Sequence, residues 1–318
     1  MLSFENISRF IHTKTGKNIA PETLRAWWNG ARPAYYIATL IPLFVGFVAA
    51  GNDMGQWRVG LFCIIVLACF FLHLAANLSN DYYDYLSGVD NDLTIGGSRM
   101  LQQGAITLKQ YRIVLVGLYA ATLLLTLLGV WWTGLTGIWG IVAFAIFSAH
   151  FYVAPPIRFG YRAMGEVLVF MSMGLVMTAG TYYVLTGLLS AKMIAVSMPI
   201  GLMVAGIMYF QSIPEIETDK LAGKRTLSNT LGPERAVKVF YGWWPTVWVM
   251  LLLVYAFGIC GWPVLLGIVV SLPLHLIACK HVRHAYTSGE WLPLDAYGKY
   301  VRMMYLAGGL GLVFGLLF

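Results

Sequence analysis

The chain has 318 residues, of which 59% are hydrophobic and only 11% are charged. A soluble domain usually carries about a quarter charged residues, so the composition argues against an ordinary soluble protein. The net charge of +7 does not indicate a nucleic-acid partner, because basic loops facing anionic lipid account for it. The four cysteines show neither metal-ligand spacing nor the pattern of a disulfide framework.

The first 33 residues are polar and lack the apolar core of a secretory signal. Within them, PETLRAWW predicts a short helix that begins at Pro21 and lies at the membrane interface through Trp27 and Trp28. We expect one all-α, polytopic membrane domain over residues 1–318, with residues 1–33 as an interfacial segment.

Nine apolar stretches follow, and most are near the length that spans a bilayer. The predicted spans are Ala34–Gly51, Gly60–Leu78, Ile113–Trp132, Ile138–Val153, Ala163–Leu185, Met193–Ile213, Tyr241–Ile259, Val264–Ile277 and Met303–Phe318. The fourth is short, and the short eighth contains Pro273.

The basic residues support this count and give an orientation. If the N-terminus is cytoplasmic, all of the 21 Lys and Arg residues except Arg58 and Lys192 fall in the N-terminal segment or after even-numbered spans. Cytoplasmic loops are enriched in Lys and Arg. The pattern therefore predicts that the N-terminus and the loops after even-numbered spans are cytoplasmic.

A first acidic motif, NLSNDYYDYLSGVDND, continues the second span. At about 100° per residue, five polar residues fall within one arc of roughly 100°. They are His73, Asn77, Asn80, Asp81 and Asp84. These side chains are expected to share one helix face, whereas Asp90 and Asp92 follow Gly88 and are expected on a loop.

A second acidic motif, YFQSIPEIETDKLAGKRTL, continues the sixth span. Gln211, Glu215 and Asp219 stand at i, i+4 and i+8, so a continuous helix would place them on one face. Pro214 would kink or break that helix. Because the second and sixth spans have the same orientation, both motifs are predicted at the same membrane depth.

Two facing groups of carboxylates repel each other unless they are protonated, paired or bridged by cations. Oxygen-rich clusters suit hard ions such as Mg²⁺, which readily shares its ligands with a substrate phosphate. Basic residues that could hold a diphosphate lie nearby: Arg99, Arg158, Arg162, Lys224 and Arg225. The sequence therefore suggests a substrate with a diphosphate head and a long apolar tail.

Some of these residues have simpler explanations. A single aspartate at a helix end is often only a solvated cap, but two clusters on even-numbered spans favour function. His73 is a functional candidate because it lies inside a span, although a hydrogen bond to a neighbouring helix is at least as good an explanation. Glu166 could simply pair with Arg162 at i−4.

These motifs together resemble the UbiA superfamily of intramembrane prenyltransferases. The resemblance rests on NLSNDYYDYLSGVDND, GGSRMLQQG, YVAPPIRFGYRAMGE, GTYYVLTG and ETDKLAGKRTLSNTLG, from Asn77 to Gly232. The sequence is most similar to the MenA branch, the 1,4-dihydroxy-2-naphthoate prenyltransferases of menaquinone synthesis. The resemblance implies a bundle of about nine transmembrane helices around a central cavity that opens sideways to lipid.

The resemblance also implies roles for individual residues. The set of residues that would bind Mg²⁺ is Asn80, Asp81, Asp84, Glu215 and Asp219. The four acidic residues of this set would also be catalytic. Asn77, Asn80, Arg99, Tyr152, Arg158 and Lys224 would bind the diphosphate. The chain departs from the family pattern at Gly88, where Asp90 is a candidate substitute, and at Glu215, where aspartate is usual. Pro214 stands where this branch commonly has a basic residue.

The expected function is Mg²⁺-dependent transfer of an isoprenyl group from its diphosphate to an aromatic acceptor, with 1,4-dihydroxy-2-naphthoate as the first candidate. A terpene cyclase of the same superfamily, or a prenyltransferase for homogentisate or another quinone precursor, remains an alternative. A transporter is the alternative outside the enzyme class. The acids gather on one side and none lies mid-membrane, which argues against an ion path.

Overall fold

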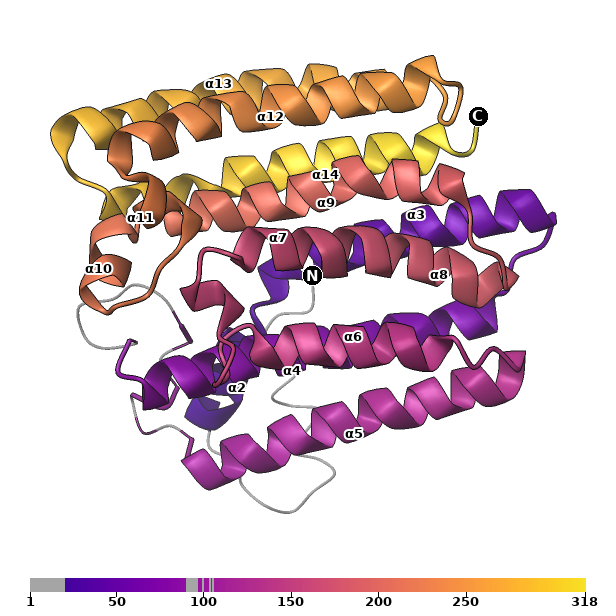
Figure 1. Cartoon of the computed structure of the whole chain (residues 1–318), viewed down its shortest axis with the longest axis horizontal. Helices are drawn as coiled ribbons and strands as arrows, with labels where there is room; N and C mark the ends of the chain where they lie inside the picture. Colours follow the sequence, from indigo (N-terminus) through magenta and orange to yellow (C-terminus); the bar gives the residue numbers. More distant parts are fainter. Residues whose placement is uncertain (1–20, 90–96, 99, 103, 105) are drawn as a thin grey trace.

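A computed structural model describes residues 21–89, 97–98, 100–102, 104 and 106–318. The described residues form helices and no β-strand, with one isolated β-bridge between Arg162 and Arg225. The long helices lie side by side along the longest axis of the molecule, and the short elements α10 and α11 gather at one end of them (Figure 1). The all-α prediction is confirmed.

Each predicted span coincides with a helix. These are α3 (Ile37–Met54), α4 (Val59–Leu86), α5 (Leu108–Thr133), α6 (Ile138–Phe151), the α7–η3–α8 segment (Gly165–Thr186), α9 (Ala191–Ser212), α12 (Pro233–Ala256), α13 (Pro263–Ser288) and α14 (Gly298–Gly315). Among the described residues, seven helices are long and apolar enough to cross a membrane. The helices α6 and α14 are not among those seven, so the count of nine crossings is not confirmed.

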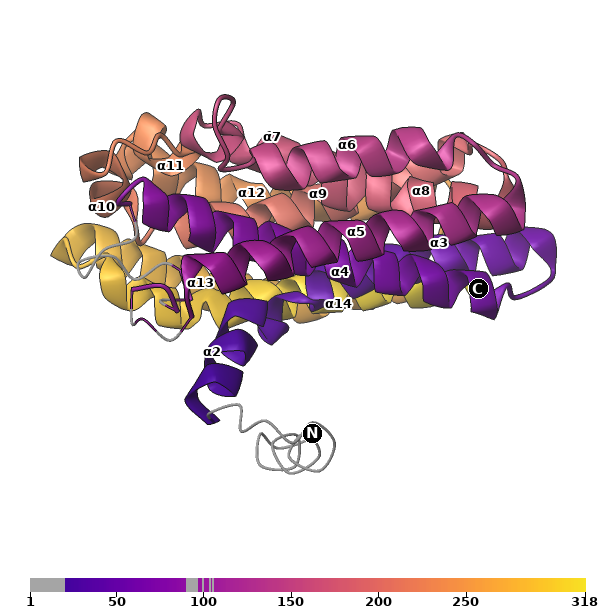
Figure 2. The same ribbon diagram turned by 90° about the horizontal axis from the view of Figure 1, so that it is seen from below.

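Short elements cluster at the end of the bundle where α4 and α9 finish. They are α2 (Pro21–Ala31), η1 (Pro33–Tyr35), η2 (Phe159–Tyr161), α10 (Ile216–Leu221), α11 (Leu227–Leu231) and η4 (Leu292–Tyr297). The helix predicted to start at Pro21 is confirmed as α2, which stands outside the bundle in Figure 2, at the same end as α10 and α11. We call this end of the molecule the mouth.

The two acidic motifs end their helices differently. Helix α4 runs without interruption to Leu86, which confirms the first motif as helical through Asp84. Helix α9 stops at Ser212, and a turn precedes α10, so the prediction of one continuous face through the second motif is wrong. Pro214 is the cause, because proline lacks the N–H that a helix interior needs and its ring clashes with the preceding turn.

A chamber of about 970 Å³ opens at the mouth and reaches into the bundle. Its walls come from α3, α4, α5, α6, the α7–η3–α8 segment and α9. Helices α12, α13 and α14 pack together, and α12 and α14 also pack on α9 (Figure 1). That side of the protein supplies much of the buried apolar core and supports the chamber wall from behind.

Close helix contact at the chamber wall depends on two glycines. A Cβ on Gly174, in the π-helical segment η3 (Phe170–Val176), would lie 2.2 Å from Cα of Gly201 in α9. A Cβ on Gly201 would lie 2.8 Å from the carbonyl oxygen of Phe170. Only glycine at both positions lets the two helices approach this closely.

Candidate active site

Helix α4 carries a row of polar side chains along the chamber. His73, Asn77, Asn80 and Asp84 stand at i, i+4, i+7 and i+11, and all four line the cavity. This is the spacing of one helix face. The row runs from the apolar interior to the mouth, with Asp84 nearest the mouth.

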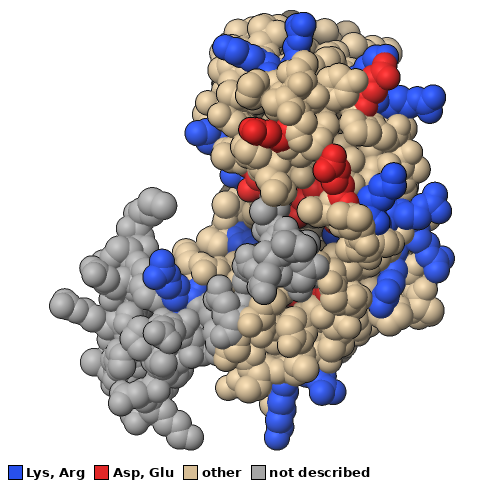
Figure 3. Space-filling model, turned by 90° about the vertical axis from the view of Figure 1, so that its left-hand side faces the viewer, with Lys and Arg blue, Asp and Glu red and all other residues tan. Residues whose placement is uncertain are grey.

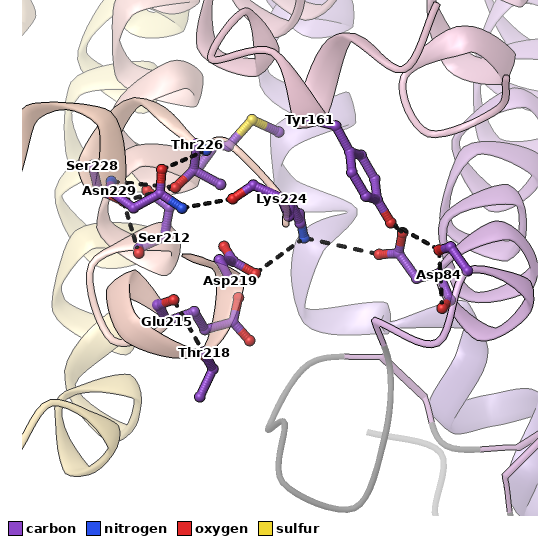
Figure 4. A network of polar contacts seen from close by, with 12 residues as sticks. Asp84, Tyr161, Ser212, Glu215, Thr218, Asp219, Lys224, Thr226, Ser228 and Asn229 are labelled. Carbon is purple, nitrogen blue, oxygen red and sulfur yellow. Dashed lines mark hydrogen bonds and ion pairs between the residues drawn. The ribbon is translucent and has the colours of Figure 1, made fainter. Parts of the chain in front are cut away.

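Lys224 joins the two acidic motifs. Its Nζ lies 3.9 Å from Oδ2 of Asp84 and 3.6 Å from Oδ1 of Asp219. Figure 4 shows the ammonium between the two carboxylates, with Glu215 on the turn before α10. Glu215 also lines the chamber. The structure therefore brings both motifs to one place despite the break at Pro214.

The loop that presents Lys224 is held by hydrogen bonds from its own sequence. Gly223 ends the short helix α10 with a φ of 73°, a left-handed conformation that glycine adopts without strain. The backbone N–H of Lys224 donates to the carbonyl of Asp219, and Nδ2 of Asn229 donates to the carbonyl of Lys224. Ser228 ties α11 to α9 by donating to the carbonyl of Ser212 (Figure 4). These contacts fix Lys224 at the mouth.

The charges at the mouth depend on one another. Burial by itself lowers the pKa of the Lys224 ammonium, but the carboxylates of Asp84 and Asp219 outweigh it and raise that pKa. Burial raises the pKa of the Asp219 carboxyl, while Lys224 opposes that rise. Lys224 is therefore charged at neutral pH and neutralises part of the negative charge of the two motifs.

Tyr161 is a site residue that the sequence analysis did not single out. Its hydroxyl donates to Oδ1 of Asp84, and its ring lies 5.3 Å from the Arg158 guanidinium and 5.8 Å from Nζ of Lys224. The residue belongs to APPIRFGYR, a motif already singled out, but its spacing in the sequence does not predict which side chain it contacts. Tyr161 links the loop after α6 to the first acidic motif.

We predict that Tyr161→Phe lowers kcat/KM for the prenyl diphosphate by about 10- to 100-fold, since a hydrogen bond to a charged group contributes roughly 1.5–3 kcal/mol. Initial rates in detergent micelles measure this. The matched control is Tyr182→Phe, which removes a tyrosine–aspartate hydrogen bond of 2.8 Å to Asp53 at the far end of the bundle. Equal losses in the two variants would show that the effect is general destabilisation.

Tyr152 lines the chamber, as its predicted role in diphosphate binding requires. Its hydroxyl contacts Sδ of Met208 at 3.2 Å. A Cβ on Gly160 would lie 2.8 Å from Cε1 of the Tyr152 ring, and one on Gly165 would lie 2.7 Å from its hydroxyl. The two glycines of the GYRAMG segment thus leave room for this ring.

Asp81 does not line the chamber. Its Oδ1 accepts a hydrogen bond of 2.5 Å from Nη2 of Arg32, and its Oδ2 accepts one of 3.2 Å from the Tyr111 hydroxyl. Arg32 does line the chamber, from a left-handed backbone position with a φ of 50°. Asp81 is therefore placed to hold Arg32 at the mouth rather than to share a ligand with Asp84.

The remaining basic candidates are dispersed. Arg99, like Asp90 and Asp92, lies outside the described residues. Arg158 is not a lining residue and reaches the site through Tyr161. The simpler explanation of Glu166, a pair with Arg162, is not what the structure has, because Nη2 of Arg162 donates to the carbonyl of Pro156 while Glu166 lines the chamber. The strained loop, with Ala163 at a φ of 55°, turns the two side chains apart.

The residues at the mouth fit a hard divalent cation. Within the described ranges, no group of three or more His, Cys, Asp or Glu side chains is assembled as a metal site. However, Oδ1 of Asn80 and Oδ2 of Asp219 are buried oxygens without a hydrogen-bond partner among the described residues. Buried acceptors seldom stay unsatisfied, and carboxylate and amide oxygens are the ligands that Mg²⁺ prefers. Asn80, Asp84, Glu215 and Asp219 form the set that would hold such an ion.

Basic side chains gather at the edge of the mouth. Viewed onto that end of the molecule, most acidic side chains lie near the middle of the face and one lies at the upper right edge, and Lys and Arg side chains project mainly at the top, right and bottom (Figure 3). Arg58 and Lys192 belong to the opposite end, where α4 and α9 begin. The charge separation predicted from the sequence thus matches the fold.

Comparison with known proteins identifies the family. The model of the UbiA prenyltransferase family matches residues 39–293. The chain belongs to the UbiA prenyltransferase family. It is 30% identical over 227 residues to a 1,4-dihydroxy-2-naphthoate octaprenyltransferase of Haemophilus influenzae, covering 68% of this chain and 72% of that protein. It is 28% identical over 281 residues to a 2-carboxy-1,4-naphthoquinone phytyltransferase of a Synechocystis species, covering 85% and 87% of the two chains.

Solved structures of this family have the same fold. A UbiA homologue from Archaeoglobus fulgidus, bound to GPP and Mg²⁺, superposes with a TM-score of 0.57 at 18% identity, covering 90% of this chain and 99% of that one. A UbiA homologue from Aeropyrum pernix gives a TM-score of 0.61 at 17% identity, covering 85% and 96%. This UbiA-family chain is accordingly an integral, multi-pass membrane protein and a prenyltransferase.

Proposed function

We propose that this chain transfers an isoprenyl group from an isoprenyl diphosphate to the ring of 1,4-dihydroxy-2-naphthoate. The observation that carries the proposal is the meeting of Asp84, Asp219 and Lys224 at the mouth of a large apolar chamber. The acceptor follows from the relatives in Haemophilus influenzae and Bacillus subtilis, which are named as 1,4-dihydroxy-2-naphthoate octaprenyltransferases.

The mouth would bind the diphosphate through charge and through amide groups. Lys224 supplies a buried ammonium, and Nδ2 of Asn77 is a buried donor without a partner in the described structure. Both suit phosphate oxygens. Asn80, Asp84, Glu215 and Asp219 would hold Mg²⁺, which when bound would neutralise the diphosphate and make it a better leaving group.

The chamber would protect the reacting carbon. As the C–O bond to the diphosphate breaks, the allylic carbons become positively charged, and the π face of the Tyr152 ring can stabilise that charge. Apolar walls exclude water, which would otherwise capture the cation. The electron-rich acceptor ring then attacks the allylic carbon, while the diphosphate keeps the electron pair of the broken C–O bond. Where the new bond forms at the ring carbon that carries the carboxylate, loss of CO₂ alone restores the aromatic ring.

We further propose that the mouth faces the cytoplasm. Basic side chains gather at the edge of the mouth, whereas Arg58 and Lys192 lie at the other end (Figure 3). Enrichment of Lys and Arg marks the cytoplasmic side of membrane proteins. Labelling of a single engineered cysteine at Lys220 in inverted and right-side-out vesicles tests this, and labelling from the outside alone contradicts it.

We expect the purified protein with Mg²⁺, several prenyl diphosphates and a panel of aromatic acids to yield a decarboxylated, prenylated naphthalenediol, read by mass spectrometry. Removing Mg²⁺ with a chelator should stop the reaction, and adding Mg²⁺ should restore it. If homogentisate were the only acid prenylated, it would replace 1,4-dihydroxy-2-naphthoate as the proposed acceptor. A cyclic terpene formed without any acceptor would replace the proposal by the cyclase alternative, and transport without diphosphate release would refute it.

A further inference from the structure

His73 is the innermost residue of the polar row on α4. Thr39 Oγ1, in α3, lies 2.5 Å from Nδ1 of its ring, and the Tyr36 ring lies 4.9 Å from it, centroid to centroid. No other described residue makes a hydrogen bond to the His73 ring. The imidazole lines the chamber, so its second nitrogen, Nε2, is available to a molecule bound there.

The depth of His73 separates it from the diphosphate site. His73 lies deeper in the chamber than Asn77 by four helical steps, about 6 Å, and deeper than Asn80 by seven steps, about 10 Å at about 1.5 Å per residue. A diphosphate held at the mouth by Asn80, Asp84 and Lys224, with Asn77 at its inner edge, therefore ends one helical turn short of the imidazole. The first carbon of the prenyl group is bonded to the diphosphate. An aromatic ring that contacts this carbon from the inner side would therefore lie at the depth of His73.

Other walls of the chamber suit the prenyl tail instead. Ile141 and Val142 of α6 and Met173 of η3 present apolar surface. Two hydroxyls on these walls are already satisfied, because Ser172 donates to the carbonyl of Leu168 and Thr181 to that of Met177. Oγ of Ser148 has no partner among the described residues, but it lies near the mouth end of α6. A tail packed there leaves the α3–α4 wall, with His73, for the acceptor ring.

We propose that His73 binds the aromatic acceptor by a hydrogen bond between its Nε2 and a ring hydroxyl. Thr39 holds Nδ1 and thereby fixes the orientation of the imidazole. A hydroxyl both donates and accepts, so it satisfies Nε2 in either tautomer. The ligand class is an aromatic ring with a free phenolic hydroxyl. The inference rests on the proposed function, because it places the second substrate of the same reaction.

The test compares His73→Phe with the wild type on two acceptors, the hydroxylated ring and its methyl ether at the same position. We expect His73→Phe to raise KM for the hydroxylated acceptor roughly 10- to 100-fold, with KM for the prenyl diphosphate changed by less than about twofold. The wild type should discriminate against the ether, and His73→Phe should not. A merely structural role would weaken both acceptors equally, and that result overturns the proposal.

Two further variants keep the test decisive if His73→Phe folds poorly. His73→Gln places an amide near the position of Nε2 and should retain most of the discrimination. Thr39→Val leaves the imidazole but frees its orientation, and should give an intermediate rise in KM for the acceptor. Full discrimination in Thr39→Val would refute the role of Thr39, and no discrimination in His73→Gln would refute the hydrogen bond from position 73. A wild type that uses no hydroxylated ring at all defeats the proposed function instead.

Discussion

Replacing Asp84 with alanine is expected to lower prenyl transfer at least about a thousandfold while leaving folded protein, and Asp219→Ala should do the same. Each carboxylate lies within 4 Å of Lys224, and Oδ2 of Asp219 has no partner in the described structure. Loss of either carboxylate removes a ligand from the proposed ion site and leaves the Lys224 ammonium with one of its two carboxylate partners. Single-turnover rates with saturating Mg²⁺ measure the effect.

The matched control for this prediction is Glu217→Ala. Glu217 lies in the same short helix as Asp219, but its side chain is exposed and does not line the chamber. It should keep wild-type activity. Asp81→Asn should keep more activity than Asp84→Ala, because Asp81 acts through Arg32. Near-normal, Mg²⁺-dependent transfer by Asp84→Ala would refute the assignment of the ion site.

Lys224→Met is expected to have the second large effect, on both binding and stability. The ammonium is mostly buried between two carboxylates, and removing one partner of a buried pair costs roughly 3–5 kcal/mol. We therefore expect a lower melting temperature in detergent and at least about a hundredfold rise in KM for the prenyl diphosphate.

Mg²⁺ should distinguish the role of Lys224 from general packing. Without the ammonium, the carboxylates of Asp84 and Asp219 have more to gain from a divalent ion, so Mg²⁺ should raise the melting temperature of Lys224→Met more than that of the wild type. Lys220→Met, an exposed lysine in α10, is the control and should behave as the wild type. Equal Mg²⁺ shifts in all three proteins would contradict this arrangement.

The sequence predicted the helices and the motifs better than the contacts between side chains. Helical periodicity placed Asn77, Asn80 and Asp84 on one chamber-facing row, because α4 is regular over that whole length. The same projection included Asp81, because an arc of roughly 100° is wider than the cavity wall. Arg32 directly follows α2 and has a left-handed backbone conformation. Only its tertiary position, which the sequence does not give, shows where Asp81 points.

The second motif illustrates a different limit. Pro214 was recognised as a helix breaker, but the direction taken by the chain after a break depends on tertiary contacts. Here the link from Ser228 to Ser212 and the turn at Gly223 return Lys224 and Asp219 to the mouth. The backbone also explains the departure from the family pattern at Gly88. This residue follows the end of α4 with a φ of 72°, a left-handed conformation that glycine adopts more readily than aspartate.

The place of the Lys224 ammonium has a consequence for assembly in the membrane. A cluster of carboxylates with no counterion would need its metal before it could fold, as small zinc domains do. Here the polypeptide brings its own counterion, Lys224, so we expect the chain to fold in a magnesium-poor setting. Under the proposed function, loading would be an exchange of cations, in which the divalent ion would take the place of the lysine between the acids as the pyrophosphate arrives.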